Sequence, residues 1–288
     1  MSIEVLTMWY NEAYLAPFFL KHYAYADKIT LLYDADTTDN TLEIVNSFPN
    51  VHIVPFQFPD MMDDELKRDI LNTQYRQTEC DWVLGVDADE FVFYKKENDF
   101  CNDLHPFLND NLGYDVFYVT LYQVYRHEDD ADLDPDMPPV PQRRHGDPNV
   151  TKGWKALYNK PILVHKGLDM SWSNGVHGIK LALRNGLNIH WRDCHNKMKF
   201  SGHPLKKFIA KFMKIFGIFP GKISPTPLLG AHWSMADPGF ALERRIKNRK
   251  ERQSKNNLAK GMGIQNHTVT EKDIMDKFAR HKNDPQLF

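Results

Sequence analysis

Three acidic residues directly follow a short apolar run in the first third of the chain. Asp87, Asp89 and Glu90 come after the run at 82–86, Trp-Val-Leu-Gly-Val. Transfer from a nucleotide diphosphate leaves charge on the leaving group, and a hard divalent ion held by carboxylates and diphosphate oxygens neutralises it. Because side chains alternate along a strand, Asp87 and Asp89 can share one ion only if the chain turns there. A bare D-x-D triplet is also typical of a solvated acidic turn, so its meaning depends on context.

Short apolar runs and helix-spaced segments alternate over the first hundred residues. The runs at 3–7, 29–33, 51–54 and 82–86 predict buried strands, and the segments at 13–24, 39–48 and 63–77 predict helices. This alternation favours an α/β fold with a mostly parallel sheet flanked by helices. Ligands of such sheets bind at the carboxyl ends of the strands.

Polar residues follow three of the four predicted strands. Trp9, Tyr10, Asn11 and Glu12 follow the first; Asp34, Asp36 and Asp39 follow the second; Asp87, Asp89 and Glu90 follow the fourth. Since these ends meet at one edge of a parallel sheet, we expect the three clusters to converge on one site.

In order and spacing, the segments 9–12, 33–41 and 81–91 resemble the successive signatures of family 2-like glycosyltransferases with the GT-A fold. The resemblance covers about residues 1–95 and implies a GT-A-like sheet with a smaller acceptor-side region. It also implies a polysaccharide-biosynthesis enzyme of the hexosyltransferase type, which moves a sugar from a nucleotide-diphosphate donor, expected to be a UDP-sugar, to a hydroxyl of a glycan or glycolipid. The implied cofactor is Mn²⁺ or Mg²⁺.

The resemblance assigns roles to individual residues. The nucleotide would lie near Met8, Tyr10, Asn11 and Asp34, with Arg68 close to the base or the diphosphate; Asp87 would serve the ribose and the metal, and Asp89 the metal. Each has a structural alternative. Asp34 and Asp39 suit a turn and a helix N-cap, the interpretation that we prefer for Asp39. Tyr10 could pack in the core, and Arg68 could be a solvated helix charge.

Two of the thirteen histidines are candidates for the site. His232, in Gly-Ala-His-Trp, resembles the late histidine that completes the metal shell in GT-A enzymes, and imidazole suits manganese. We expect an inverting enzyme, which needs a base for the acceptor hydroxyl, and Asp169 and His177 are the candidates. Asp193 and Glu128 are alternatives, and a retaining enzyme would need no base.

The second half of the chain is less regular. We expect residues 1–125 to form the nucleotide-sugar-binding half of one domain, 126–150 a flexible loop, and 151–288 an acceptor-binding half with C-terminal helices. A strand is predicted at 114–125, strand pieces near 179–191 and a polar helix at 238–258. The indole rings of Trp154, Trp172, Trp191 and Trp233 suit either sugar faces in an acceptor subsite or the core.

The segment 204–216 is basic and amphipathic, with lysines edging an apolar face. It suits peripheral contact with anionic lipid, and core packing is the alternative. The basic run 244–252 is compatible with an anionic or membrane-borne acceptor, although such runs usually form a solvated helix face.

Composition excludes several other classes. With 36 basic and 38 acidic residues among 288, the chain is not expected to bind nucleic acid. Three cysteines without C-x-x-C spacing argue against a disulfide framework. The cysteine pattern fits a reducing, cytoplasmic setting. No apolar run reaches the length of a membrane span, so any membrane contact is expected to be peripheral, at the inner face.

Two competing functions remain at this point. The run before Asp34-Ala-Asp36-Thr also fits the nucleophile motif of haloacid-dehalogenase-like phosphatases, with Asp34 as nucleophile and Asp36 as acid/base. That assignment leaves the clusters at 10–12 and 87–90 unexplained. The other is a non-catalytic nucleotide-sugar binder that keeps the fold without the chemistry.

Overall fold

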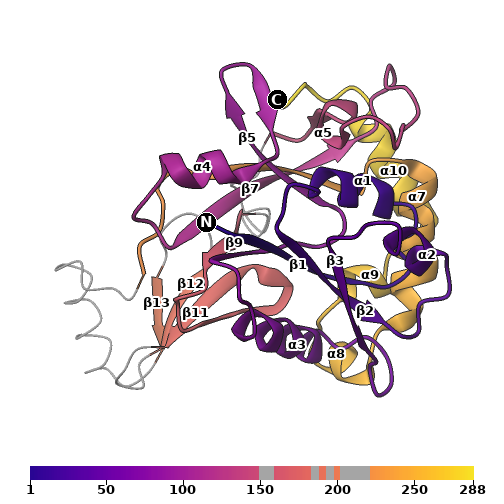
Figure 1. Cartoon of the computed structure of the whole chain (residues 1–288). Helices are drawn as coiled ribbons and strands as arrows, with labels where there is room; N and C mark the ends of the chain where they lie inside the picture. The colour runs from indigo at the N-terminus through magenta and orange to yellow at the C-terminus, as the bar shows by residue number, and fades with distance from the viewer. Residues whose placement is uncertain (149–158, 183–187, 193–197, 202–220) are drawn as a thin grey trace.

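The computed structural model describes residues 1–148, 159–182, 188–192, 198–201 and 221–288. In these ranges the chain forms a ten-stranded mixed sheet, a separate four-stranded sheet and helices around them (Figure 1). The strands are β1 Ile3–Trp9, β2 Lys28–Asp34, β3 Val51–Phe56, β4 Trp82–Gly85, β5 Glu90–Lys96, β6 Asp99–Cys101, β7 Val116–Tyr125, β8 His145–Gly146, β9 Asn159–His165, β10 Met170–Trp172, β11 Gly178–Ala182, β12 Asn188–Arg192, β13 Met198–Ser201 and β14 Leu228–Met235. The helices are α1 Ala16–His22, α2 Thr41–Val45, α3 Asp64–Arg76, α4 Leu104–Asp110, α5 Pro139–Gln142, η2 Asn174–Val176, α7 Pro238–Leu242, η3 Glu243–Arg249, η4 Lys250–Arg252, α8 Lys255–Ala259, α9 Ile264–His267 and α10 Glu271–His281.

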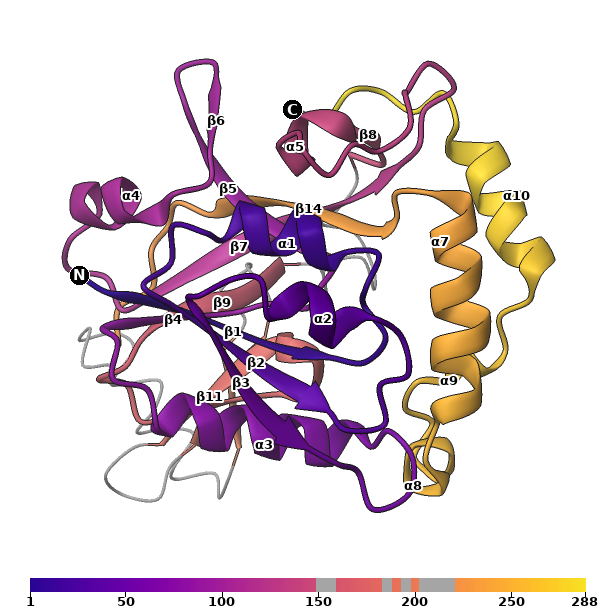
Figure 2. The same cartoon turned by 45° about the vertical axis from the view of Figure 1, so that its right-hand side comes forward.

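The first part of the large sheet is parallel, with strand order β3-β2-β1-β4. The chain passes from β1 outward to β3 and then returns past β1 to β4. Because β-α-β crossovers are right-handed, α1 and α2 lie on one face of these strands and α3 on the other. Figure 2 shows α1 and α2 above β1, β2 and β3, and α3 below them. The predicted α/β class, with a parallel nucleotide-half sheet flanked by helices, is confirmed.

Burial explains why β1, β2 and β4 are strands, whereas β3, at the edge of the sheet, has no buried residue. All but one of the residues of β1 are buried, and the pairs Val5–Ile29 and Val5–Leu84 face each other across the sheet. A strand covered on both faces is mostly apolar rather than alternating, and in β1 the two polar residues, Glu4 and Thr7, are buried as well. Trp9 at the end of β1 meets Phe19 of α1 edge to face, with 5.1 Å between ring centroids, which joins the first helix to the sheet.

Side-chain caps fix the starts of the two helices that matter most for the site. Asp63 accepts hydrogen bonds from the backbone N–H groups of Glu65 and Leu66 at the start of α3. Asp237 accepts from Gly239 and Phe240 at the start of α7, and Pro238 occupies the first helical position. Both arrangements satisfy amide groups that have no partner inside a helix.

The two expected halves share one sheet. β9, from the second half, lies between β4 and β7, and β14 pairs with both β7 and β5. The smaller sheet, β10-β11-β12-β13, is antiparallel and lies beside α3 (Figure 1). The boundaries at 125 and 150 thus describe chain order, while the core of the large sheet is built from both halves.

The segment expected to be a loop contains packed residues over its described part, 126–148. The side chain of Arg143 is 1% exposed and donates from Nε to the backbone oxygen of Ala236 at 2.8 Å. Val140 is also buried. Asp136 forms an ion pair with Lys21 of α1 at 2.6 Å. These contacts attach the segment to the large sheet and its first helix.

Several predicted features lie outside the described residues: the amphipathic segment 204–216, Trp154 and Asp193, as well as the side chain of Trp191. The other two tryptophans of the second half, Trp172 and Trp233, are buried, so they pack in the core. Across the part of the chain that the structure describes, no helix has both the length and the apolar character of a bilayer span.

Candidate functional site

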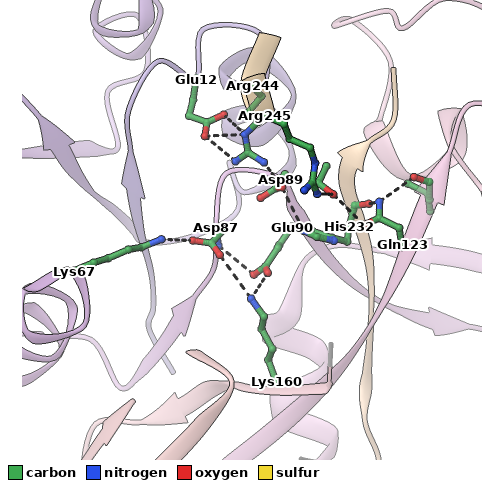
Figure 3. Close-up of polar contacts among 12 residues, drawn as sticks. Glu12, Lys67, Asp87, Asp89, Glu90, Gln123, Lys160, His232, Arg244 and Arg245 are labelled. Atoms are coloured by element: carbon green, nitrogen blue, oxygen red, sulfur yellow. Dashed lines mark hydrogen bonds and ion pairs between the residues drawn. The ribbon is translucent and has the colours of Figure 1, made fainter. Parts of the chain in front are cut away.

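The predicted polar clusters lie at one edge of the sheet. β2 and β4 both pair in parallel with β1, so Asp34 at the end of β2 and Asp87 just after β4 flank the end of β1. From the C-terminal segment 243–252, Arg252 pairs with Asp34, and Arg244 pairs with Asp89, two residues after Asp87. Figure 3 shows the cluster around Asp87 and Asp89. The convergence expected from the strand order is therefore present.

A tight turn after β4 places Asp87 and Asp89 in different surroundings. Glu90 donates its backbone N–H to the Asp87 carbonyl at 3.0 Å, and the Asp87 N–H donates to Glu90 Oε2 at 3.1 Å. The turn leaves the side chain of Asp87 27% exposed and that of Asp89 1% exposed. The two aspartates of the motif thus have different access to solvent.

Asp87 lies between two lysines. Its Oδ1 is 2.9 Å from Lys67 Nζ of α3, and its Oδ2 is 3.6 Å from Lys160 Nζ of β9 (Figure 3). Burial raises the pKa of Asp87, but the charges of Lys67 and Lys160 outweigh it and hold the pKa far below its usual range. Asp87 is therefore ionised and faces a positively charged, partly open surface.

Lys160 is itself part of a buried ion pair. Its Nζ lies 2.5 Å from Glu90 Oε1, and neither side chain is more than 5% exposed. Burial raises the pKa of Glu90. For Lys160, burial lowers the pKa, but the carboxylates of Glu90 and Asp87 raise it above its usual value. The lysine thus stays charged beside Asp87 in spite of its burial.

Asp89 belongs to a buried network with the C-terminal segment. Its Oδ2 accepts from Arg244 Nη1 and lies 3.3 Å from His232 Nε2 of β14. Arg244 also donates to both oxygens of Glu12, from Nη2 to Oε1 at 2.7 Å and from Nε to Oε2 at 3.2 Å. Burial raises the pKa of Asp89, but Arg244 and His232 lower it well below the usual value.

The carboxylate of Glu12 responds differently to the same arginine. Burial raises its pKa, and the opposing effect of Arg244 is smaller. The Arg244 guanidinium, 3% exposed, therefore lies between two buried carboxylates that are far apart in the sequence. Such a bidentate arrangement fixes the position of both partners.

A second arginine of the C-terminal segment covers the predicted nucleotide position. The guanidinium carbon of Arg252 lies 3.5 Å from the ring centroid of Tyr10. Its Nη1 donates to Asp34 Oδ2 at 3.0 Å and its Nη2 to Asp36 Oδ2 at 3.3 Å. A planar donor group thus stacks on Tyr10 and bonds to Asp34, the two residues that the family resemblance assigns to the base, while Met8 is half-buried nearby in the chain.

Asn11 and Asp39 shape the loops around this position. Asn11 has a φ of 50°, and its Oδ1 accepts from the Thr38 N–H at 2.8 Å. Asp39 accepts from the N–H groups of Ala13 and Thr41, each at 3.0 Å. Both side chains therefore connect the loop after β1 to the loop after β2. The contact of Asp39 with Thr41 agrees with the turn interpretation, but the N-cap of α2 is Asn40, one residue later, and its side chain makes no capping hydrogen bond.

The geometry does not favour Asp34 as a phosphatase nucleophile. Asp34 is 1% exposed, its Oδ2 is paired with Arg252, and its Oδ1 accepts from the backbone N–H of Asp36. A nucleophile needs a free, accessible oxygen in line with the phosphorus atom. Neither oxygen of Asp34 meets that requirement here.

Among the described residues, the predicted metal ligands Asp87, Asp89 and His232 are not grouped around one position that could hold a divalent ion. Carboxylate and imidazole donors suit Mn²⁺. However, Asp89 and His232 face each other and Arg244, and in the described residues no three His, Cys, Asp or Glu side chains are grouped to hold a metal. Asp87 retains partial exposure, and Lys67, its partner at 2.9 Å, is itself 22% exposed.

The remaining predicted site residues lie elsewhere. Arg68 pairs with its neighbour Asp69 at 2.7 Å and donates to Asn174 Oδ1 at 3.4 Å. The residue of α3 that contacts Asp87 is the preceding one, Lys67. His177 lines the same groove as Arg68.

Asp169 and Glu128, the two predicted carboxylate bases that lie in the described residues, do not join the cluster. Asp169 is exposed and follows β9, whose residue His165 pairs with Trp82 at the beginning of β4. It therefore lies at the opposite end of β4 from Asp87. Glu128 lies in the segment 126–148, where it pairs with Lys282 at 3.5 Å.

Sequence reasoning missed four residues of the cluster. Lys67 and Lys160 were not singled out, and Arg244 and Arg252 were placed on a solvated helix face, although their side chains are 3% and 12% exposed. Helix η3, Glu243–Arg249, is π-helical, a form found often at functional sites. The one signal in the sequence for Arg244 and Arg252 was that they lie in a segment rich in basic residues.

The sequence matches no protein-family model and no curated protein. Among solved structures, it is similar to TarS 1-349 of S. aureus in complex with UDP-GlcNAc, with 15% identity over 98% of this chain and 72% of that chain and a TM-score of 0.38. Against another S. aureus TarS structure the identity is 18%, over 60% of this chain, with a TM-score of 0.36; this chain spans only 30% of that one. A glucosyl-3-phosphoglycerate synthase from Mycobacterium tuberculosis, in complex with Mn²⁺, UDP and glucosyl-3-phosphoglycerate, shares 17% identity over 42% of this chain and 44% of that chain, with a TM-score of 0.30.

Proposed function

We propose that this chain is a GT-A-like glycosyltransferase that moves a sugar from a nucleotide-diphosphate donor, a UDP-sugar, to a hydroxyl of a glycan or glycolipid acceptor. The observation that carries the proposal is the convergence of an aromatic ring, Tyr10, and two carboxylates, Asp34 and Asp87, on one sheet edge beside partly exposed cations. Ligands of open α/β sheets bind at this edge.

The contacts of Arg252 suggest how the base would bind. Arg252 presents a planar face to Tyr10 and N–H donors to Asp34. A pyrimidine base also has a planar face and an N–H group, so it suits the same two partners. In the proposal the base stacks on Tyr10 and donates to Asp34, while Asn11 shapes the adjoining loop.

Asp87 and its lysines would serve the diphosphate end of the donor. Asp87 is ionised and partly exposed, and Lys67 lies next to it at 2.9 Å. Asp87 would hold a divalent cation, Mn²⁺ or Mg²⁺, which would neutralise charge on the departing diphosphate. Lys67 and Lys160 place two further positive charges on the same side, which favours an anionic leaving group. Asp89, which contacts both Arg244 and His232, would position the turn.

For the acceptor, His177 is the proposed base of an inverting transfer. It lines the groove beside α3, whose residue Lys67 reaches Asp87. A neutral imidazole accepts a proton from a hydroxyl near physiological pH. The imidazole would take the proton while the hydroxyl oxygen attacks the sugar.

The test is UDP binding with and without Mn²⁺, measured by calorimetry, together with release of UDP from UDP-sugars. The wild type should bind UDP more tightly with Mn²⁺, and Asp87→Asn should lose at least about tenfold in affinity, or about 1.4 kcal/mol. Asp276→Asn, an exposed aspartate of α10, is the matched control and should bind as the wild type does.

Three other results would each contradict part of this proposal. Metal-independent binding that Asp87→Asn leaves unchanged would remove Asp87 from the site. Tight binding without any turnover of UDP-sugars would favour the non-catalytic binder. Hydrolysis of an aryl phosphate without UDP binding would favour the phosphatase.

A further inference from the structure

A polar groove of about 760 Å³ runs along α3 beside the proposed donor site. One wall is α3, and the other is formed by β10, the turn η2 and the start of β11. The residues that line it are Arg68, Asp69, Asn72, Thr73, Arg76, Ser171, Trp172, Ser173, Asn174, His177, Gly178, Ile179 and Lys180. The groove therefore lies between the nucleotide half of the sheet and the smaller sheet of the second half.

The groove adjoins Asp87 through two contacts. Arg68, which lines it, directly follows Lys67, the partner of Asp87. On the other wall, the ring of Trp172 packs against Gly85, where a Cβ atom would lie only 3.0 Å from the ring. Gly85 is the last residue of β4, two positions before Asp87. Through the ring of Trp172, the groove is therefore connected to the end of β4, two residues before Asp87.

The walls of the groove are firmly joined. Asn72, buried on α3, accepts from the Trp172 N–H at 2.7 Å and donates to the Trp172 carbonyl at 3.1 Å. These two hydrogen bonds join the backbone of β10 at Trp172 to the side chain of Asn72 on α3. Because both backbone groups are satisfied, the groove is a fixed feature rather than a gap between loosely packed elements.

The turn at the rim of the groove has a strained backbone. Val176, a β-branched residue, has a φ of 58°, and Gly175 before it has a φ of 65°. A Cβ atom at Gly175 would lie 2.8 Å from the His177 ring, so glycine allows that ring to fold over the turn. Backbone strain of this kind is concentrated at functional sites, where surrounding contacts hold it in place.

The charges on the groove are mostly positive. Arg68, Asn72 and Arg76 recur at intervals of four residues, so they form one stripe of α3. Arg76 is exposed, Lys180 is exposed on the opposite wall, and Asp69 is the single acidic residue among those that line the groove. Eight residues of helix place Arg68 and Arg76 about 12 Å apart along the axis.

We propose that this groove binds an acceptor sugar chain that carries negatively charged groups, phosphate or carboxylate. The inference rests on the proposed glycosyltransferase function and specifies its acceptor class. Guanidinium groups bind phosphate and carboxylate through paired N–H donors. Cations about 12 Å apart suit an extended chain rather than one small anion, and the hydroxyls of Thr73, Ser171 and Ser173 suit sugar hydroxyls.

The experiment compares three chain-like probes with UDP at saturation: maltopentaose, which is neutral, oligogalacturonate, which carries carboxylates, and short-chain inorganic polyphosphate. Affinities are measured by calorimetry at low salt. At least one anionic chain should bind tenfold or more tightly than maltopentaose, and the tighter of the two identifies the charged group. If neither binds more tightly than maltopentaose, the inference is wrong.

Two double variants test whether the anionic chain binds in the groove. Arg76→Gln with Lys180→Gln should weaken the anionic chain at least fivefold and leave UDP affinity unchanged, because neither residue contacts the donor position. The matched control, Lys95→Gln with Lys96→Gln, removes two exposed positive charges from β5 and should change affinity less than twofold. Equal losses in both double variants would mean that net charge, and not the groove, attracts the chain.

The two proposals can fail separately. If the wild type binds UDP but no anionic chain, the donor assignment stands and the acceptor class is wrong. If it binds no UDP, the proposed function is wrong. The groove is then tested without UDP by the same double variants.

Discussion

Two arginines from one short C-terminal segment bind pairs of carboxylates in very different surroundings. Arg244 is 3% exposed and lies between Glu12 and Asp89, both buried. Arg252, eight positions later, pairs with Asp34 and Asp36, rests on Tyr10, and one of its partners, Asp36, is 37% exposed. The same residue type thus holds the fold together at one end of the site and covers an accessible ligand position at the other.

The two arginines differ in whether a ligand could take over their contacts. Nothing from solvent can reach the carboxylates around Arg244, so their charges depend on it. At Arg252, a ligand with a flat face and an N–H group could take over the same contacts. Its backbone is fixed, because the Arg252 carbonyl accepts from the Met62 N–H at 2.9 Å, so the exchange needs only a side-chain movement.

The largest expected effect is at Arg244. Arg244→Met leaves Glu12 and Asp89 buried without their shared counter-charge, and we expect the free energy of unfolding to fall by about 3–5 kcal/mol. Urea unfolding at pH 7 measures it. Arg280→Met, on the exposed face of α10, is the control and should change stability little. A loss for Arg244→Met as small as that of the control would break the comparison, because Arg244 would then be no more structural than Arg252.

His22 is buried without a counter-charge among the described residues, and this contrasts with Arg244, which pairs with two carboxylates. The ring of His22 is buried, its Nε2 lies 2.8 Å from the Val92 carbonyl, and burial lowers its pKa to about 4 despite that hydrogen bond. In the unfolded chain its pKa is about 6.5. Between these values the unfolded chain binds the proton and the folded chain does not, so stability falls as the pH is lowered from about 6.5 to 4.

The loss attributable to His22 is about 3 kcal/mol across that window, at about 1.4 kcal/mol per pH unit. Urea unfolding at pH 7, 5.5 and 4.5 measures it in the wild type and in His22→Gln, which cannot gain a proton. The variant should have the flatter profile. Parallel profiles would show that His22 is not the group whose burial limits stability in acid.

The smallest effect is expected at Arg252, and it has the opposite sign. Arg252→Ala frees the face of Tyr10 and a carboxylate oxygen of Asp34, so UDP affinity should rise by about threefold, less than 1 kcal/mol. Calorimetric titration of UDP measures it, with Lys260→Ala on the nearby surface as the control. Weaker binding in Arg252→Ala would mean that the arginine contacts the bound nucleotide rather than competing with it, which would remove the contrast with Arg244.

The parallel half of the sheet was predictable from the sequence because its signals are local. Apolar runs gave β1, β2, β3 and β4 to within about two residues, and the order of strands and helices required their carboxyl ends to meet. The convergence of Asp34 and Asp87 followed from that order alone.

The partners of those residues were not predictable, since they depend on contacts between distant segments. Arg244 reaches Glu12 across 232 residues, and a segment rich in basic residues does not reveal which of its arginines will be buried. Likewise, Lys67 rather than Arg68 reaches Asp87, because neighbouring helix positions point about 100° apart. Asp169 lies at the far end of β4 because of the antiparallel pairing of β9, which no local pattern indicated.

The sequence by itself thus determined the α/β order of elements and the sheet edge at which the acidic residues gather, because hydrophobic periodicity and strand order are properties of short segments. The tertiary structure alone decided which carboxylate stays open and which is buried against an arginine. Charge burial depends on the full set of neighbours around a group, and here those neighbours come from β9, β14 and the C-terminal segment.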